Sequence, residues 1–139
     1  MRDLPETPVK VVLYLLGSTT PDTEEVNEFF RILSVERRRL VIARVFVLEP
    51  FGSTDANTLA HRIAGVEHDE DPETVSNADY KAMYSGLIQN HLPALADAQI
   101  ITYDRRSRRV SRGPAIHAAG IVMGAAIAVL CLLAPRDSG

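Results

Sequence analysis

Apolar residues recur at helical spacing near the start of the chain. The spacing predicts a helix over Asp22–Leu33, in which Asp22 and Glu25 stand three residues apart, as in a capping box. The inward stripe of this helix consists of Val26, Phe29, Phe30 and Leu33. Before it, the apolar run Val9–Leu16 predicts a strand, too short to span a membrane, within an N-terminal extension of residues 1–19.

Two further helices are expected before the middle of the chain. The first runs over about Val35–Val47, with Ser34 as its N-cap. The second runs over Thr54–Ala64, and Gly65 would stop it. The pattern therefore places three helices in the first half of the chain.

A charged segment and a long helix follow. The acidic segment Glu67–Pro72 is expected to be a solvated loop, since its charges cannot enter a core. Ser76 and Asp79 repeat the capping-box spacing and predict a helix over Asn77–Ala98. Pro93 would kink this helix or split it in two. Its inward stripe consists of Tyr80, Tyr84, Leu87, His91 and Leu95.

The chain then changes to a strand and turn pattern. Ile100–Tyr103 and Arg108–Val110 predict two strands, joined by a turn at Asp104–Ser107. Such a hairpin is marginal in water by itself and must bury one face on the helices. Helices followed by a terminal hairpin are the elements of a winged helix-turn-helix. We therefore predict an α+β winged-helix domain over residues 20–113.

Three segments of this region resemble a haloarchaeal winged-helix family that is known mainly as a domain of unknown function. They are Phe30–Arg39, Tyr84–Leu95 and Ala98–Asp104, within a likeness that spans Val26–Val110. The most specific motifs are Leu-Ser-x-Glu-Arg-Arg-Arg, and His-Leu-Pro-x-Leu followed by Tyr-Asp. Similar domains carry Gly where Gln99 stands, which suits a left-handed residue before the wing strand. The resemblance implies a winged helix with a transcriptional role, and it supplies no catalytic residue, ligand or target sequence.

Charge is distributed unevenly along a chain whose formal net charge is −3. That balance counts against a freely acting nucleic-acid binder, which is usually basic. The predicted wing nevertheless concentrates arginines, whose forked side chains fit phosphate oxygens. The arginines expected to contact DNA are Arg105, Arg106, Arg108 and Arg109. Alternatively, these charges form a solvated turn or anchor a membrane helix on its cytoplasmic side.

The long helix is the expected recognition helix of the winged-helix domain. Lys81, Ser85 and Gln89 lie on or near the face opposite its core stripe, and Gln89 could pair with adenine in the major groove. The rest of this face, which includes Ala78 and Ala82, is small and uncharged. That composition favours an alternative function, a protein-interaction module that does not bind DNA.

The remaining polar residues predict no catalytic centre. A second basic patch, Arg37–Arg39 with Arg44, is expected to be a solvated face paired with nearby glutamates. The histidines lack metal-ligand spacing, and His91 is expected to pack at the core edge with one ring nitrogen bonded. Cys131 is the single cysteine, so no thiolate cluster can form. We therefore predict neither an enzyme nor a bound metal or cofactor.

Residues 114–135 form a separate apolar segment. Its twenty residues Ala115–Ala134 just reach the length that a helix needs to cross a bilayer core of about 30 Å. Between Ala118 and Leu133 there is no polar face, which favours a membrane tail anchor over a C-terminal dimerisation helix. Small residues at four-residue spacing let two such helices pack closely, and here they are Gly120, Gly124 and Ala128.

Together these patterns predict a homodimeric winged-helix transcription regulator that binds double-stranded DNA and is tethered to the cytoplasmic membrane. Because the arginines precede the apolar segment, the positive-inside rule places the domain in the cytoplasm. The alternatives are a soluble cytoplasmic protein and, for the domain itself, the protein-interaction module.

Overall fold

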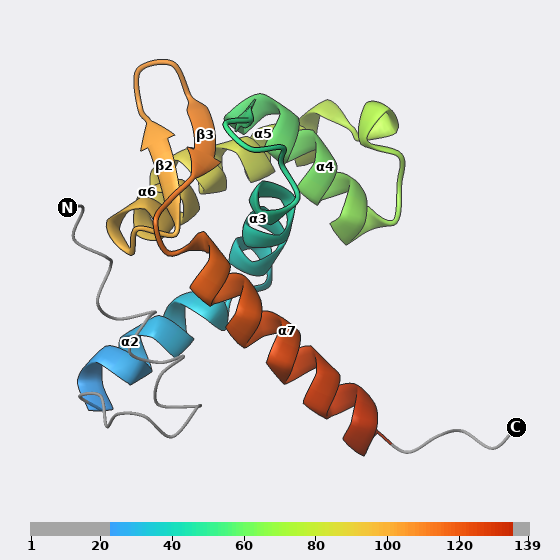
Figure 1. The fold of residues 1–139 in the computed structure, drawn as a ribbon. Coiled ribbons are helices and arrows are strands. Elements are labelled where there is room, and N and C mark those ends of the chain that lie inside the picture. The colour runs from blue at the N-terminus through green and yellow to red at the C-terminus, as the bar shows by residue number, and fades with distance from the viewer. Residues whose placement is uncertain (1–22, 135–139) are drawn as a thin grey trace, which may run out of the picture.

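The computed structural model describes residues 23–134 and begins with α2 (Figure 1). The predicted extension, residues 1–19, and its strand lie outside the described residues. The helices are α2 (Thr23–Leu33), α3 (Glu36–Phe46), α4 (Ala56–His68), α5 (Asn77–Gly86), α6 (Leu92–Asp97) and α7 (Ile116–Leu133). Two shorter helical segments are the 3-10 turn η1 (Pro72–Thr74) and the π segment η2 (Leu87–His91). The strands are β1 (Ser53–Asp55), β2 (Ile101–Asp104) and β3 (Arg109–Arg112).

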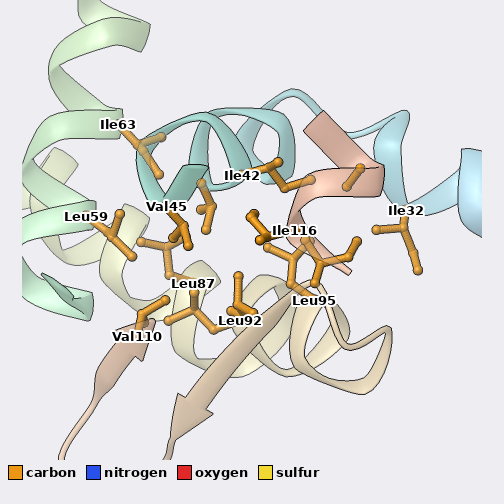
Figure 2. Close-up of a cluster of buried hydrophobic side chains, with 14 of the residues drawn as sticks. Ile32, Ile42, Val45, Leu59, Ile63, Leu87, Leu92, Leu95, Val110 and Ile116 are labelled. Carbon is orange, nitrogen blue, oxygen red and sulfur yellow. The ribbon is translucent and has the colours of Figure 1, made fainter. Parts of the chain in front are cut away.

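The core is aliphatic and lies between α3, α4, the α5–α6 run and the sheet (Figure 2). Branched side chains on α3 and α4 face those of η2, α6 and β3 across a closely packed interior. Full burial of each such side chain contributes about 1.5–3 kcal/mol. The buried residues labelled in Figure 2 include Ile42, Val45, Leu59, Ile63, Leu87, Leu92, Leu95 and Val110.

The hairpin belongs to a three-stranded antiparallel sheet with the order β1-β3-β2. Val110 on β3 pairs with Tyr103 on one side and Thr54 on the other. Thr54 was expected to begin a helix, and that prediction is wrong. The helix begins two residues later, because Asp55 is its N-cap and accepts the backbone N–H of Thr58 at 2.8 Å.

The predicted fold class is confirmed as mixed α+β, with a hairpin after the helices and an apolar helix at the C-terminal end. The order α3, β1, α4, α5–α6, β2, β3 agrees with the predicted winged-helix architecture. The hairpin does bury one face, since Ile101 and Val110 are almost fully buried. β1 adds a third strand, which makes the hairpin more than an isolated two-stranded unit.

Two predicted helix ends near α3 and α4 are wrong. Ser34 does not cap α3: its Oγ donates to the carbonyl of Arg31 at 2.7 Å, at the end of α2. Gly65 does not stop α4, which continues to His68 and is closed by Asp69 in a left-handed conformation. Glycine is needed at position 65 because the backbone of Glu70 passes close to it. A Cβ at Gly65 would lie 2.8 Å from the carbonyl oxygen of Glu70.

The long helix is continuous but changes its winding at η2. Its start is confirmed, since Ser76 Oγ accepts the backbone N–H of Asp79 at 3.1 Å. Pro93 lacks an N–H, and its ring would crowd the carbonyl of Gln89 in a regular α-helix. The π segment immediately before it widens the helix, with Leu92 bonded to Leu87 five residues back. Pro93 is therefore accommodated within the helix without ending it.

Two residues, one just before the hairpin and one in its turn, adopt left-handed backbone conformations. Gln99 has φ 62°, so this position is left-handed although it lacks the expected glycine. Arg108 has φ 61° and belongs to the turn, so the return strand begins at Arg109, one residue later than predicted.

The first two turns of α7 are part of the domain. Ile116, Ala119 and Val122 are buried, and α7 packs on α3. Gly120 lies against the ring of Phe46, where a Cβ would meet ring carbons at 2.7 Å. The packed core therefore continues past residue 113, where the sequence pattern placed the end of the domain.

Candidate nucleic-acid interface

A polar turn shapes the tip of the β2–β3 hairpin. Asp104 Oδ1 accepts the backbone N–H groups of Arg106 and Ser107, at 2.9 and 3.4 Å. The backbone N–H of Arg108 donates to the carbonyl of Asp104 at 2.7 Å and closes the turn. These hydrogen bonds, led by the one from Arg106, lower the pKa of Asp104. The carboxylate thus stays ionised and holds the arginines in a fixed loop.

The four arginines proposed from the sequence fall into two pairs. Arg105 and Arg106 are exposed, and their side chains make no hydrogen bond or ion pair within the described part of the chain. Arg108 Nη1 instead donates to the hydroxyl of Tyr103 at 3.0 Å, a bond that raises the pKa of Arg108. Arg109 donates through Nη2 to Ser53 Oγ at 2.8 Å. Two of the four guanidinium groups therefore have every donor available to a ligand.

Arg112, at the base of the hairpin, bonds to the backbone of the protein rather than facing solvent freely. Its guanidinium donates to the carbonyls of Val45, at 3.4 Å, and Phe46, at 2.8 Å. It also donates to the carbonyl of Leu48. The carbonyl of Val45 also accepts the backbone N–H of Leu48 at 3.2 Å, and a cation at the end of α3 complements the helix dipole. Arg112 therefore joins the hairpin to α3.

The outer face of the long helix contains the residues that the sequence placed there. Lys81, Ala82 and Gln89 are exposed, and Ser85 is half-buried. Met83, Leu87 and His91 face the core on the other side. In Figure 1, α5 and the hairpin tip lie at one end of the molecule, and α7 runs toward the other end.

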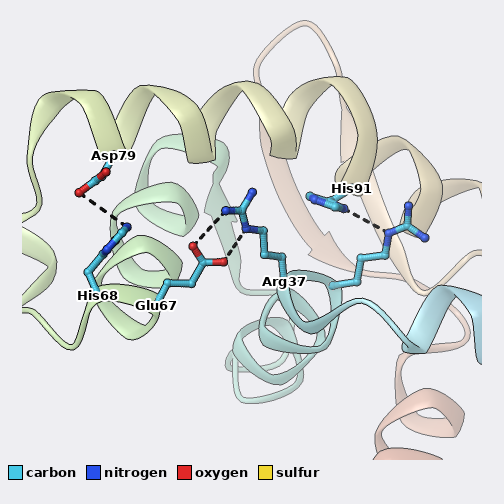
Figure 3. Close-up of polar contacts among 6 residues, drawn as sticks. Arg37, Glu67, His68, Asp79 and His91 are labelled. Carbon is cyan, nitrogen blue, oxygen red and sulfur yellow. Dashed lines mark hydrogen bonds and ion pairs between the residues drawn. The ribbon is translucent and has the colours of Figure 1, made fainter.

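An arginine–glutamate pair holds α3 against α4 (Figure 3). Arg37 Nε donates to Glu67 Oε1 at 2.5 Å, and Arg37 Nη2 donates to Oε2 at 3.0 Å. This bidentate pair raises the pKa of Arg37 and lowers that of Glu67. The prediction of a solvated loop at Glu67 is wrong, because α4 extends to this residue and directs its carboxylate at α3.

Arg38 joins α3 to the long helix. Its Nε donates to Nδ1 of His91 at 3.2 Å, and its Nη2 donates to Asn90 Oδ1 at 3.3 Å. Burial lowers the pKa of His91, and the charges of Arg38 and Arg37 lower it further. The neutral ring therefore accepts at Nδ1, and the predicted place of His91 at the core edge is confirmed.

The basic patch of α3 is thus not a solvated face. Arg39 completes the set, because its Nη1 donates to the carbonyl of Leu33 at 2.7 Å and secures the end of α2. The expectation failed because the partners come from other elements rather than from glutamates next to the patch. No local sequence signal identifies such partners, since Arg37 and Glu67 are 30 residues apart.

Two other histidines contact residues of α5. The ring of His61 stacks on that of Tyr80, with centroids 4.2 Å apart. His68 Nε2 lies 3.6 Å from an oxygen of Asp79 (Figure 3). Within residues 23–134, no cluster of His, Cys, Asp and Glu has the arrangement of a metal site.

A cavity of about 610 Å³ lies beside α4 and η1. Its lining is mostly polar and consists of Asn57, Thr58, His61, Arg62, Asp71, Pro72 and Glu73. Asp71 is also the cap of η1, with its carboxylate bonded to the N–H of Glu73 at 3.0 Å. The hydroxyl of Thr58 donates to Asp55 Oδ2 at 3.3 Å, within the N-cap of α4.

The sequence profile of one protein family matches residues 30–111, more than half of the chain, and is described as a domain of unknown function, DUF7344. The chain belongs to this family. The DUF7344 region begins within α2 and ends in β3, so it contains the long helix and the hairpin except for Arg112, but not α7. No curated protein and no solved structure matches the chain.

Proposed function

We propose that the DUF7344 domain of this chain is a winged-helix DNA-binding module that regulates transcription. The main observation behind this proposal is that Arg105 and Arg106 are exposed at the tip of a fixed hairpin. Their side chains have no partner within the described residues. Free guanidinium groups bind phosphate oxygens and release counterions from the duplex. The resemblance to haloarchaeal winged-helix domains supports the same proposal.

The proposed contacts divide into two kinds. Arg105 and Arg106 bind backbone phosphates with their full set of donors, and Arg108 and Arg109 add charge beside them. On the long helix, Lys81, Ser85 and Gln89 enter the major groove, where the amide of Gln89 pairs with adenine. The small face between these residues permits a close approach to the duplex. Such contacts hold the domain mainly through phosphates, so binding depends strongly on salt.

The proposal includes a homodimer, because two domains read two half-sites of an operator. Gly124 and Ala128 are exposed on α7 and give a second helix room to approach. Gly120 is already covered by Phe46 of its own chain, so only the distal part of the small-residue row is available.

The proposal also includes a membrane tether through residues 115–134. α7 is long and apolar enough to cross a bilayer by length and composition. Its exposed large apolar positions are spread around the helix rather than gathered on one face, and they are Ile121, Ile127, Val129, Leu130, Leu132 and Leu133. One packed partner helix covers a single face, whereas lipid surrounds them all. The hairpin remains on the cytoplasmic side, at the opposite end of the molecule (Figure 1).

Salt titration of double-stranded DNA binding tests the proposed function. The full chain in detergent is the right sample, because the first turns of α7 belong to the core. We expect the logarithm of the binding constant to fall linearly with the logarithm of salt concentration, with a slope near −0.9 for each phosphate contact. A folded dimer that does not bind DNA at low salt would contradict the proposal.

The groove contact has a separate test. Gln89→Ala should reduce discrimination between binding sites and leave the salt slope unchanged, because Gln89 contacts a base and not a phosphate. Asn27→Ala, on the exposed face of α2, is the matched control and should change neither quantity. An unchanged site preference in Gln89→Ala would remove this residue from the interface.

A second candidate function is a protein-interaction module that does not bind DNA. The exposed alanines Ala78 and Ala82 favour it, since they make the outer face of α5 small and uncharged. In that case Ala82→Tyr should abolish cross-linking of the domain to its partner in cells. DNA binding by the unaltered chain would be absent at every salt concentration.

A further inference from the structure

If α7 spans the membrane, its length limits the distance between the domain and the bilayer. The helix has 18 residues and is about 27 Å long, close to the bilayer core of about 30 Å. The part beyond Met123 has only about ten residues, or about 15 Å, and would reach half-way. The packed first two turns must therefore enter the lipid as well.

If the first two turns of α7 enter the lipid, the C-terminal end of α3 enters with them, because it lies beside them. The ring of Phe46 lies against Gly120 and makes an edge contact with the ring of His117, with centroids 5.8 Å apart. Phe46 is partly exposed, and Val47 next to it is 67% exposed. Two large apolar side chains are thus exposed next to each other at the base of α7.

Two further features fit a surface that contacts lipid. The loop that follows α3 fully exposes Phe51, which is held in a left-handed turn with φ 64°. Bulky residues rarely adopt this conformation, and no apolar burial within the domain offsets its cost. Arg112, bonded to the end of α3, places a positive charge where anionic headgroups would lie.

We propose that the C-terminal end of α3, with Phe46 and Val47 at its centre, is a lipid-contact surface that seats the domain on the bilayer. This inference rests on the proposed tether. It lets the first two turns of α7 keep their packing on α3 and still lie within the membrane. The domain is then held in one orientation, with α5 and the hairpin tip directed into the cytoplasm.

Single tryptophan reporters test the seating, because the chain has no tryptophan of its own. Val47→Trp reports on the base of α7 and Leu130→Trp on its distal half. The matched control is Val66→Trp on α4, which starts from the same residue type with a similar exposure of 60%. Val66 adjoins Glu67, which contacts the start of α3, whereas Val47 lies at its end. The full chain is reconstituted in phospholipid vesicles with brominated acyl chains.

We expect lipid bromines to quench the emission of Val47→Trp and Leu130→Trp and to leave Val66→Trp unchanged. Quenching of Val47→Trp should be strongest with bromines near the headgroup end of the acyl chain. If Leu130→Trp is quenched while Val47→Trp behaves like the control, the tether stands and the seating is wrong. If Leu130→Trp is not quenched, the tether itself fails. A blue shift of Val47→Trp without quenching would assign this surface to a second protein chain and overturn the proposal. Circular dichroism of each variant confirms that it is folded.

Discussion

Two arginine runs in this chain look alike in sequence and differ in what surrounds them. On α3, Arg37–Arg39 bond to Glu67, to His91 and to a carbonyl of α2. At the hairpin tip, Arg105 and Arg106 have no side-chain partner in the described part of the chain. A run of charge therefore indicates neither binding nor solvation by itself. What decides its role is whether the fold brings acceptors to it.

The largest effect on stability is expected from Arg112. It follows the hairpin arginines in sequence, but like the arginines of α3 it is bonded to other parts of the fold. Arg112→Met removes hydrogen bonds to three carbonyls at the end of α3. Because charge-assisted bonds contribute about 1.5–3 kcal/mol, the free energy of unfolding in urea should fall by about 2 kcal/mol. Arg44→Met, on the last turn of the same helix, is the control and should change it by less than about 0.5 kcal/mol. Equal effects of the two would contradict the assignment.

A smaller loss is expected at the contact between α3 and the long helix. Arg38→Met removes the donor to His91 Nδ1 and leaves that partly desolvated nitrogen without its partner. The free energy of unfolding should fall by about 1–2 kcal/mol in urea denaturation. Because the hairpin tip is untouched, DNA affinity of the folded variant should stay the same. Weaker DNA binding with unchanged stability would place Arg38 in the interface instead.

The free energy of unfolding should depend on pH in a way that shows that His91 is neutral in the folded protein. Its folded pKa lies below its ordinary value of 6.5, so its stabilising contribution is complete above that pH. The contribution is lost as the pH falls from 6.5 toward the folded pKa, because the unfolded chain takes up the proton first. His91→Gln keeps an acceptor for Arg38 and should remove this part of the slope. A variant with the same slope as the parent would assign the titration to another group.

The smallest effect is expected from the Arg37–Glu67 pair, which is partly exposed. The pKa of Glu67 is lowered, so its contribution is present above the ordinary carboxyl value and is lost as the pH falls below it. Solvent screening limits Glu67→Gln to a loss of at most about 1 kcal/mol near neutral pH. The difference between this variant and the parent should vanish in acid. A difference that persists there would show a packing effect rather than an ion pair.

Local signals predicted much of the fold. The cap at Ser76 and the polar turn after β2 depend on residues two or three positions apart, and such spacing can be read directly. The fold class followed from helical patterns and a terminal hairpin. The Asx turn at Asp104 could also have been recognised, since Asp commonly bonds the backbone two residues on.

The sequence did not predict features that depend on partners distant along the chain. β1 has no alternating apolar pattern, and Ser53–Asp55 is a strand only because β3 pairs with it. The partner carbonyls of Arg112 lie more than sixty residues earlier in the chain. In α7, an all-apolar sequence could not tell which side packs on α3. Only the fold could show that Gly120 already faces Phe46.

The contrast between the two arginine runs is tested most directly by one paired measurement on the full chain in detergent. Arg105→Ser/Arg106→Ser and Arg37→Ser/Arg38→Ser are each assayed for the salt slope of DNA binding and for unfolding in urea. We predict that the hairpin variant reduces the slope by about 2, for two lost phosphate contacts, and keeps its urea midpoint. The α3 variant should unfold at lower urea concentration and keep the slope while folded. An unchanged slope in the hairpin variant, or a reduced slope with normal stability in the α3 variant, would contradict the account.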